Sequence, residues 1–178
     1  MFTKQYERTV SMLTKGINYV VNNRTLKAEF YNYLAASEHE LNNHKASDEY
    51  YEKSLALIPD NPLVLNNYSY YLSLRSKNLD KAQAMALKAL DLNPNEATYQ
   101  DTYGWVLYKL GQYKEALEWI KKAVEGTDRP SAEVLEHYGD VLYKLNQTKE
   151  AKDYWNRALE IEKSERLQKK VTEGLLDE

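Results

Sequence analysis

Apolar residues recur along this chain every three or four positions, with polar residues between them. The stretch 3–22 illustrates the pattern, because Tyr6, Val10, Leu13 and Ile17 would share one face of a helix. Segments such as "IPDNP" (58–62) and "LNPNE" (92–96) interrupt the pattern and are suited to stop one helix and start the next. The pattern therefore predicts an all-α protein built from short helices.

The pattern also repeats on a longer scale. "DTYGWVLYKLGQYKEALEWIKKAV" (101–124) is followed by "EHYGDVLYKLNQTKEAKDYWNRAL" (136–159), and two further copies lie upstream. Small residues mark three fixed positions in each copy, separated by 34 or 35 residues: Ala35, Ser69, Gly104 and Gly139; Ser47, Ala82, Ala116 and Ala151; Ser54, Ala89, Ala123 and Ala158. Small residues let two helix axes approach closely, so each copy predicts a helical hairpin.

Turn and cap residues fall where such hairpins need them. Three predicted turns carry residue types that tolerate a positive φ: Asn42, Gly111 and Asn146. The remaining turn is the longer segment "SKN" (76–78). Asn61, placed before a proline, and Ser131 are the expected N-caps of the helices that follow them.

These motifs resemble the tetratricopeptide repeat (TPR) family, which has 34-residue helix–turn–helix units with small residues at the same three positions. Pro59 and Pro94 also match a proline common in that family. The resemblance implies an all-α, right-handed superhelix, an α-solenoid of four helix–turn–helix repeats. We assign the repeats to 28–61, 62–96, 97–131 and 132–165, an N-terminal helix within 1–24 to a truncated repeat or cap, and a C-terminal capping helix to 166–178.

Composition excludes several other classes of protein. The net charge is −3 and the pI about 5.7, which argues against nucleic-acid binding. The basic cluster Lys163, Arg166, Lys169 and Lys170 is interspersed with glutamates, and we interpret it as a solvated helix face. The chain has no cysteine, and no run of about 18 apolar residues predicts a transmembrane segment.

The location in the cell depends on what precedes the chain. If Met1 is the native start, a cytoplasmic protein is expected. The sequence motif "YGWVLYKLG…EAL" is also similar to the C-terminal repeats of bacterial TPR proteins, some of them envelope lipoproteins. If the chain is such a C-terminal fragment, a periplasmic or cell-envelope location is expected.

Evidence for catalytic chemistry is sparse. "HELNNH" (39–44) resembles a zinc-protease motif, but its second histidine lies at i+5, about 100° away from the i+4 position around the helix. Glu133, Glu136, His137 and Asp140 cluster on one helix, and we interpret them as a solvated acidic face. We expect no cofactor and no metal, and a metal-dependent enzyme remains only a minor alternative.

The resemblance implies that a ligand lies in a concave groove lined by the first helix of each repeat. The residues assigned to this groove are Asn32, Asn66, Tyr70, Asp101, Trp105, Tyr108, Glu133, Glu136, Asp140 and Tyr143. Asn32, Asn66 and Asp101 form a ladder of hydrogen-bonding side chains suited to a peptide backbone. Tyr70 and Trp105 either contact the ligand or pack between neighbouring repeats.

The leading hypothesis is a non-enzymatic scaffold that binds a peptide or a partner helix in this groove. Acidic residues in the C-terminal half of the groove favour a neutral or basic partner. TPR domains that clamp a terminal carboxylate use Lys and Arg, whereas this chain has Asn32, Ala36, Asn67, Thr98 and Thr102 at the matching positions. The alternative is self-association, with a homodimer formed through the apolar stripe of residues 3–22.

Overall fold

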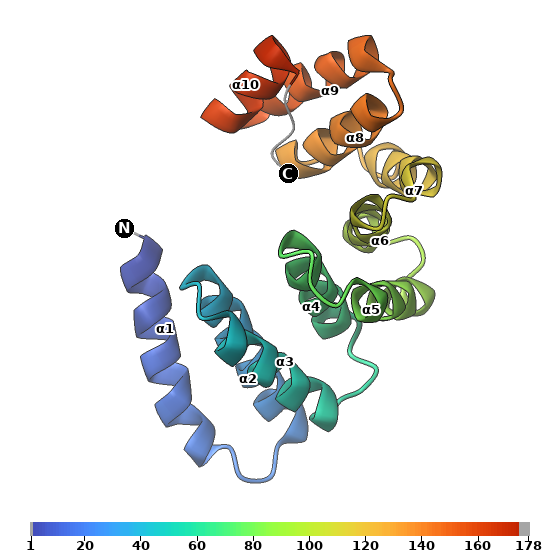
Figure 1. Cartoon of the computed structure of the whole chain (residues 1–178). Coiled ribbons are helices and arrows are strands. Elements are labelled where there is room, and N and C mark those ends of the chain that lie inside the picture. Colours follow the sequence, from blue (N-terminus) through green and yellow to red (C-terminus); the bar gives the residue numbers. More distant parts are fainter. Residues whose placement is uncertain (1, 175–178) are drawn as a thin grey trace.

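The computed structural model describes residues 2–174, and within them the chain forms ten α-helices and one short 3-10 helix (Figure 1). In chain order these are α1 (Phe2–Gly16), η1 (Ile17–Tyr19), α2 (Arg24–Glu40), α3 (His44–Leu57), α4 (Pro62–Leu74), α5 (Leu79–Leu92), α6 (Ala97–Lys109), α7 (Tyr113–Glu125), α8 (Ala132–Lys144), α9 (Thr148–Ile161) and α10 (Glu165–Glu173). Helices α2 to α9 pair as four hairpins, α2 with α3, α4 with α5, α6 with α7 and α8 with α9. The predicted all-α arrangement of paired helices is confirmed.

The hairpins close tightly where the repeat places a small residue. A Cβ atom added to Gly104 would lie 2.5 Å from Ile120 Cγ1 in α7, and one added to Gly139 would lie 2.5 Å from Trp155 Cδ1 in α9. Real Cβ atoms do not approach other atoms so closely, so these two positions have no room for a side chain. The first small position of the repeat is therefore a contact between the two helices of a hairpin.

The turns have the predicted backbone conformation. Asn42, Gly111 and Asn146 have φ values of 61°, 78° and 64°. In the longer second turn, Ser76 and Asn78 both have a φ of 48°. A left-handed residue reverses the chain after a helix, which explains why Asn and Gly recur at this point.

Side-chain caps start two of the inner helices as the sequence predicts. The Asn61 side chain accepts a hydrogen bond from the main-chain N–H of Val64, and Ser131 does the same for Val134. Pro62 follows Asn61 as the first residue of α4, where its missing N–H costs nothing.

The hairpins stack into an open arc (Figure 1). Helices α4, α6 and α8 lie on the inner side of the arc, and α5, α7 and α9 lie outside them. Helix α1 at one end and α10 at the other face each other across the opening. The inner side is thus a surface made of one helix per repeat.

The core is continuous along the arc and rich in aromatic rings. One cluster of buried residues joins the first three hairpins, and a second joins the last two with α10. Tyr51 and Trp155 are fully buried within these clusters, at 0% exposed.

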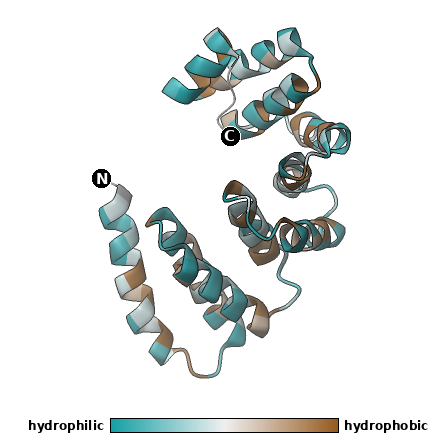
Figure 2. Cartoon of the chain, in the orientation of Figure 1, coloured by the Kyte–Doolittle hydropathy of each residue, from teal (hydrophilic) through white to brown (hydrophobic). Residues whose placement is uncertain are grey.

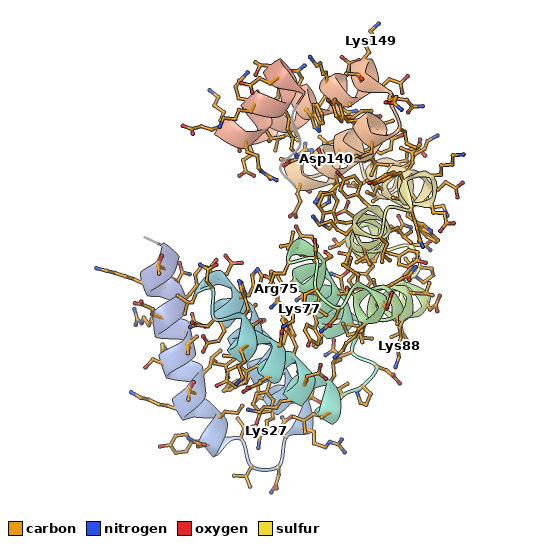
Figure 3. All side chains as sticks on the ribbon, viewed as in Figure 1. Lys27, Arg75, Lys77, Lys88, Asp140 and Lys149 are labelled. Carbon is orange, nitrogen blue, oxygen red and sulfur yellow. The ribbon has the colours of Figure 1, made fainter. Side chains whose placement is uncertain are left out.

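Ion pairs connect the first hairpin to the second. Asp48 of α3 pairs with Arg75 at 2.6 Å and with Lys77 at 3.4 Å. One helical turn further along α3, Glu52 pairs with Lys81 of α5. Arg75 and Lys77 lie at the boundary between the α2–α3 hairpin and α4 (Figure 3). We call the ion pairs made by Asp48 and Glu52 the polar joint.

The two end helices differ in extent from the prediction. The N-terminal helix was expected over 3–22, but α1 ends at Gly16, a poor helix former, and a 3-10 turn follows it. The last helix was expected over 166–178, but α10 begins at Glu165 and ends at Glu173, and Gly174 follows it with a φ of 70°, the left-handed conformation of a C-cap. The rest of that predicted helix, 175–178, lies outside the described residues.

The apolar stripe of α1 is half-buried, because α1 packs against α2. Met12, on another face of this helix, is 60% exposed. Within residues 2–174, none of the helices combines the length and the apolar character needed to cross a membrane.

Candidate functional site

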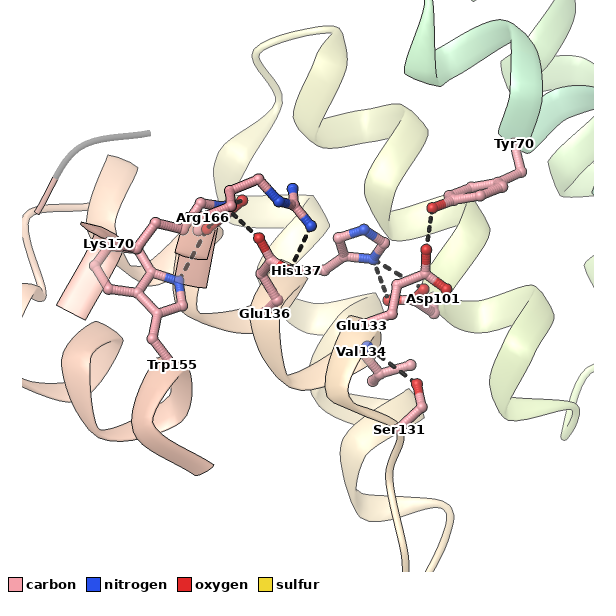
Figure 4. A network of polar contacts seen from close by, with 11 residues as sticks. Tyr70, Asp101, Ser131, Glu133, Val134, Glu136, His137, Trp155, Arg166 and Lys170 are labelled. Carbon is pink, nitrogen blue, oxygen red and sulfur yellow. Dashed lines mark hydrogen bonds and ion pairs between the residues drawn. The ribbon is translucent and has the colours of Figure 1, made fainter. Parts of the chain in front are cut away.

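The candidate site is the inner face of the arc, where equivalent positions of the inner helices meet. Figure 4 shows separate groups of polar contacts along this face, between Tyr70 in α4 and Lys170 in α10. Most of the residues assigned to a groove from the sequence belong to this region. The structure shows which of them are already engaged within the chain.

Asp101 of α6 is bound to the next inner helix. The Asp101 carboxylate accepts a hydrogen bond from His137 Nδ1 of α8, with N···O distances of 3.0 and 3.1 Å. Both side chains are buried, at 5% exposed for each residue. Burial alone would lower the pKa of His137, but Asp101, together with Glu133 and Asp140, raises that pKa above its ordinary value.

Glu136 and Asp140 of α8 are bound to α10 in the same manner. Lys170 Nζ lies 2.7 Å from Glu136 Oε1 and 2.7 Å from Asp140 Oδ2, and Lys170 is only 2% exposed. Arg166 donates a second hydrogen bond to Glu136 at 2.8 Å, and Trp155 Nε1 donates to Asp140 at 2.9 Å. The two acidic side chains therefore accept five hydrogen bonds from three residues of the chain.

Two interpretations of charge from the sequence are wrong here. Glu136 and Asp140 were assigned to a solvated acidic face, and Lys170 to a solvated basic face, yet all three are buried. The reason is that α10 packs on α8 and places its cation between the two carboxylates. Burial raises the pKa of Asp140, and Lys170 acts in the opposite direction.

Tyr70 connects inner helices that belong to repeats two apart. Its hydroxyl donates a hydrogen bond to Glu133 of α8, and the two residues are separated by 63 positions in the sequence. Burial and this carboxylate both raise the pKa of Tyr70. We call this contact the Tyr70–Glu133 bridge. It links the inner helices of the second and fourth repeats.

The aromatic residues of α6 are packed rather than exposed. Trp105 stacks on His137 with ring centroids 3.9 Å apart and on Tyr108 at 4.7 Å. Both Trp105 and Tyr108 are at most 9% exposed. Of the two roles left open for Trp105, packing between repeats is the one seen in this structure. Tyr143 is half-buried against Trp155, at 5.5 Å between ring centroids.

The asparagines of the ladder are buried as well. Asn32 is 6% and Asn66 3% exposed, and their side-chain oxygens accept no hydrogen bond from the described residues. Asp101 and Glu136 hold the equivalent positions in the later repeats. The ladder is therefore a set of contacts between helices in the C-terminal half of the arc, whereas in the N-terminal half the side-chain oxygens of Asn32 and Asn66 have no donor among the described residues.

Exposed apolar residues lie instead on the first two inner helices. Leu63 and Leu74, at the two ends of α4, are 49% and 41% exposed, and Tyr33 of α2 is 59% exposed. Apolar positions are brown and polar positions teal in Figure 2. None of these three is among the residues assigned to the groove from the sequence. Their place on the inner face could have been predicted from helical spacing. Leu74 lies on the same face of α4 as Leu63 and Tyr70, and Tyr33 holds the corresponding position in α2.

His39 and His44, the pair in the protease-like motif, lie near the polar joint. Their ring centroids are 5.1 Å apart, and His39 stacks on Tyr71 of α4 at 3.9 Å. Burial and the neighbouring His44 lower the pKa of His39 to about 4. Within residues 2–174, no three His, Asp or Glu side chains gather closely enough to hold a metal ion.

Comparison with known proteins gives one family and several relatives. The tetratricopeptide repeat family matches residues 2–164. The TPR repeat-containing protein PA4667 of Pseudomonas aeruginosa is 32% identical over 90 residues, which cover 48% of this chain and 15% of that protein. The chain thus matches only a small part of the length of this bacterial relative.

Solved structures share the fold at low sequence identity. TTC0263, a thermophilic TPR protein of Thermus thermophilus, superimposes with a TM-score of 0.74 at 18% identity, over 94% of this chain and 89% of that one. A chain of the APC/C hetero-tetramer Cut9-Hcn1 superimposes with a TM-score of 0.81 at 19% identity, over 97% of this chain and 34% of that one.

Proposed function

Because the chain belongs to the tetratricopeptide repeat family, we propose that it is a scaffold that holds a protein partner against the inner face of its arc. Members of this family are generally non-enzymatic scaffolds, and the fold implies protein partners. The hetero-tetramer Cut9-Hcn1 contains a chain of similar fold within an assembly.

One observation carries the proposal. The inner helix α4 has no charged residue and keeps large apolar side chains in solvent at both of its ends, Leu63 and Leu74. Exposed apolar side chains that share one face of a helix are favourable sites for a protein partner, because burying them removes apolar surface from water.

The structure weakens the expectation, drawn from the sequence, that the partner is basic. Asp101, Glu136 and Asp140 were expected to favour a basic ligand, but each already contacts His137 or Lys170. Attraction between these carboxylates and a partner is therefore reduced. The apolar part of the inner face becomes the main source of binding free energy.

Site-specific photocrosslinking tests the proposal. A photoreactive amino acid is placed at Leu63, Thr98 or Glu133 on the inner helices, and at the exposed Leu87 on the outer helix α5 as a control. We expect covalent adducts with a protein partner in the source cells from at least one inner position and none from Leu87. Adducts from neither side, or from Leu87 alone, would contradict a role of the inner face in partner binding.

A further inference from the structure

One row of side chains on each inner helix can be compared directly between repeats. On α4 the row is Leu63, Asn67, Tyr70 and Leu74, spaced by four, three and four residues, which places it on one helix face. The equivalent rows are Glu29, Tyr33, Ala36 and Glu40 on α2; Thr98, Thr102, Trp105 and Lys109 on α6; and Glu133, His137, Asp140 and Lys144 on α8. Tyr70 points toward α8 (Figure 4), so the rows face the inside of the arc.

The rows differ sharply in exposure. In α6 and α8 the two middle residues of the row are buried, Thr102 and Trp105 in α6 and His137 and Asp140 in α8. In α2 the middle residue Tyr33 is 59% exposed, and in α4 the end residues Leu63 and Leu74 remain nearly half exposed. An incoming chain can thus reach apolar side chains of the rows on α2 and α4 only. We call these two rows the open rows.

The geometry of the open rows fits a helix better than an extended segment. Leu63 and Leu74 are eleven residues apart, or about 16 Å along a helix at 1.5 Å per residue. Rows spaced by three and four residues interdigitate with the same rows on a second helix. An extended segment would instead need side chains that bond to its main chain, and the candidates for that role, Asn32 and Asn66, are buried.

The charges beside the open rows indicate what kind of partner helix would bind there. Glu29 and Glu40 are exposed at the two ends of the row on α2, and neither forms an ion pair within residues 2–174. The row on α4 carries no charge. A partner with Lys or Arg beside an apolar stripe would match both features, since the stripe would lie on α4 and the cations would meet the two glutamates.

We propose, building on the scaffold function above, that the open rows of α2 and α4 bind an amphipathic helix of about three turns with an apolar stripe flanked by Lys or Arg. The helix lies along α4 on the N-terminal side of the Tyr70–Glu133 bridge. The C-terminal half of the inner face is closed to it, because His137 and Lys170 already contact the carboxylates there.

Selection from a phage-displayed library of random 16-residue peptides tests the class of partner. We expect selected sequences to share apolar residues at i, i+3 or i+4 and i+7, with Lys or Arg enriched on the flanks. Apolar residues at alternate positions would indicate an extended ligand and overturn the proposal. Selection of no peptide would overturn it as well.

Variants of the protein test the location. The selected peptide is titrated by fluorescence anisotropy against Leu63→Glu and Leu74→Glu, with Leu87→Glu and Leu92→Glu as controls of similar exposure (40% and 45%) on the outer helix α5. We expect each inner variant to lose at least tenfold in affinity and each control less than twofold. Glu29→Lys with Glu40→Lys should weaken binding severalfold, and more at low salt than at high salt. Equal effects of the inner and outer variants would overturn the location.

The two proposals can fail separately. If photocrosslinks form from Thr98 or Glu133 but not from Leu63, the scaffold function stands and the open rows are the wrong surface. If no inner position crosslinks to any protein, the scaffold function itself fails.

Discussion

At the scale of single residues, Lys170 neutralises two buried carboxylates, those of Glu136 and Asp140. Replacing it with Met, which has a similar length and no charge, leaves both carboxylates buried without their main partner. We expect Lys170→Met to reduce the free energy of unfolding by about 3–5 kcal/mol, as measured by urea denaturation. Lys169→Met is the matched control, because Lys169 is exposed and should change stability by less than about 0.5 kcal/mol. Equal stability of the two variants would show that the buried ion pairs are not needed for folding.

His39 should make stability depend on pH. Its pKa is lowered to about 4 in the folded chain, mainly by burial, against an ordinary value of 6.5. Between these two values the unfolded chain binds the proton and the folded chain does not, so stability falls as the pH drops from 6.5 to 4. We expect His39→Phe, which keeps a ring beside Tyr71, to flatten this part of the profile of unfolding free energy against pH. An unchanged slope would mean that His39 titrates normally.

At the scale of a helical hairpin, Gly104 and Gly139 set how closely two helices pack. An added Cβ atom would clash with Ile120 at the first position and with Trp155 at the second. We expect Gly104→Ala and Gly139→Ala each to lower the free energy of unfolding by about 1–3 kcal/mol, with α-helical content retained. The cost should be greater at Gly139, since moving Trp155 also disturbs its hydrogen bond to Asp140.

Gly111→Asn is the control for these two variants. Gly111 has a positive φ and open space around it, and the equivalent turns already contain Asn42 and Asn146. The substitution should therefore be nearly neutral in the same urea experiment. A loss as large as that of Gly139→Ala would indicate that glycine removal in general, and not close packing, causes the destabilisation.

The helices were more predictable from sequence than the contacts between them. Gly104 and Asn42 have roles that depend on their own hairpin, so a repeating pattern of residue types identifies them. The roles of Lys170 and His137 depend on which side chain of another helix they contact. A repeating pattern of residue types along the sequence does not contain that information. Trp105 illustrates the difference, because its helical position indicates the inner face but not that His137 stacks on it.

At the scale of the whole molecule, we expect the polar joint to couple the unfolding of the first hairpin to that of the rest. All three tryptophans, Trp105, Trp119 and Trp155, lie in the third and fourth hairpins, so their fluorescence reports only that part. We expect Arg75→Met, which breaks the pair with Asp48, to separate a first transition seen by circular dichroism from a later one seen by fluorescence. The unaltered chain should give coincident transitions. Coincident transitions in Arg75→Met would mean that apolar contacts alone couple the hairpins.

The Tyr70–Glu133 bridge has a consequence for how such an array can change in length. Solenoids grow and shrink by duplicating or losing whole repeats, which is tolerated when every repeat contacts only its immediate neighbours. Here a side chain of the second repeat contacts one in the fourth, so a repeat inserted between them would move Tyr70 and Glu133 out of reach of one another. Duplication at either end of the chain would leave them together. A repeat inserted in the interior of this array would therefore remove the bridge, whereas one added at an end would keep it.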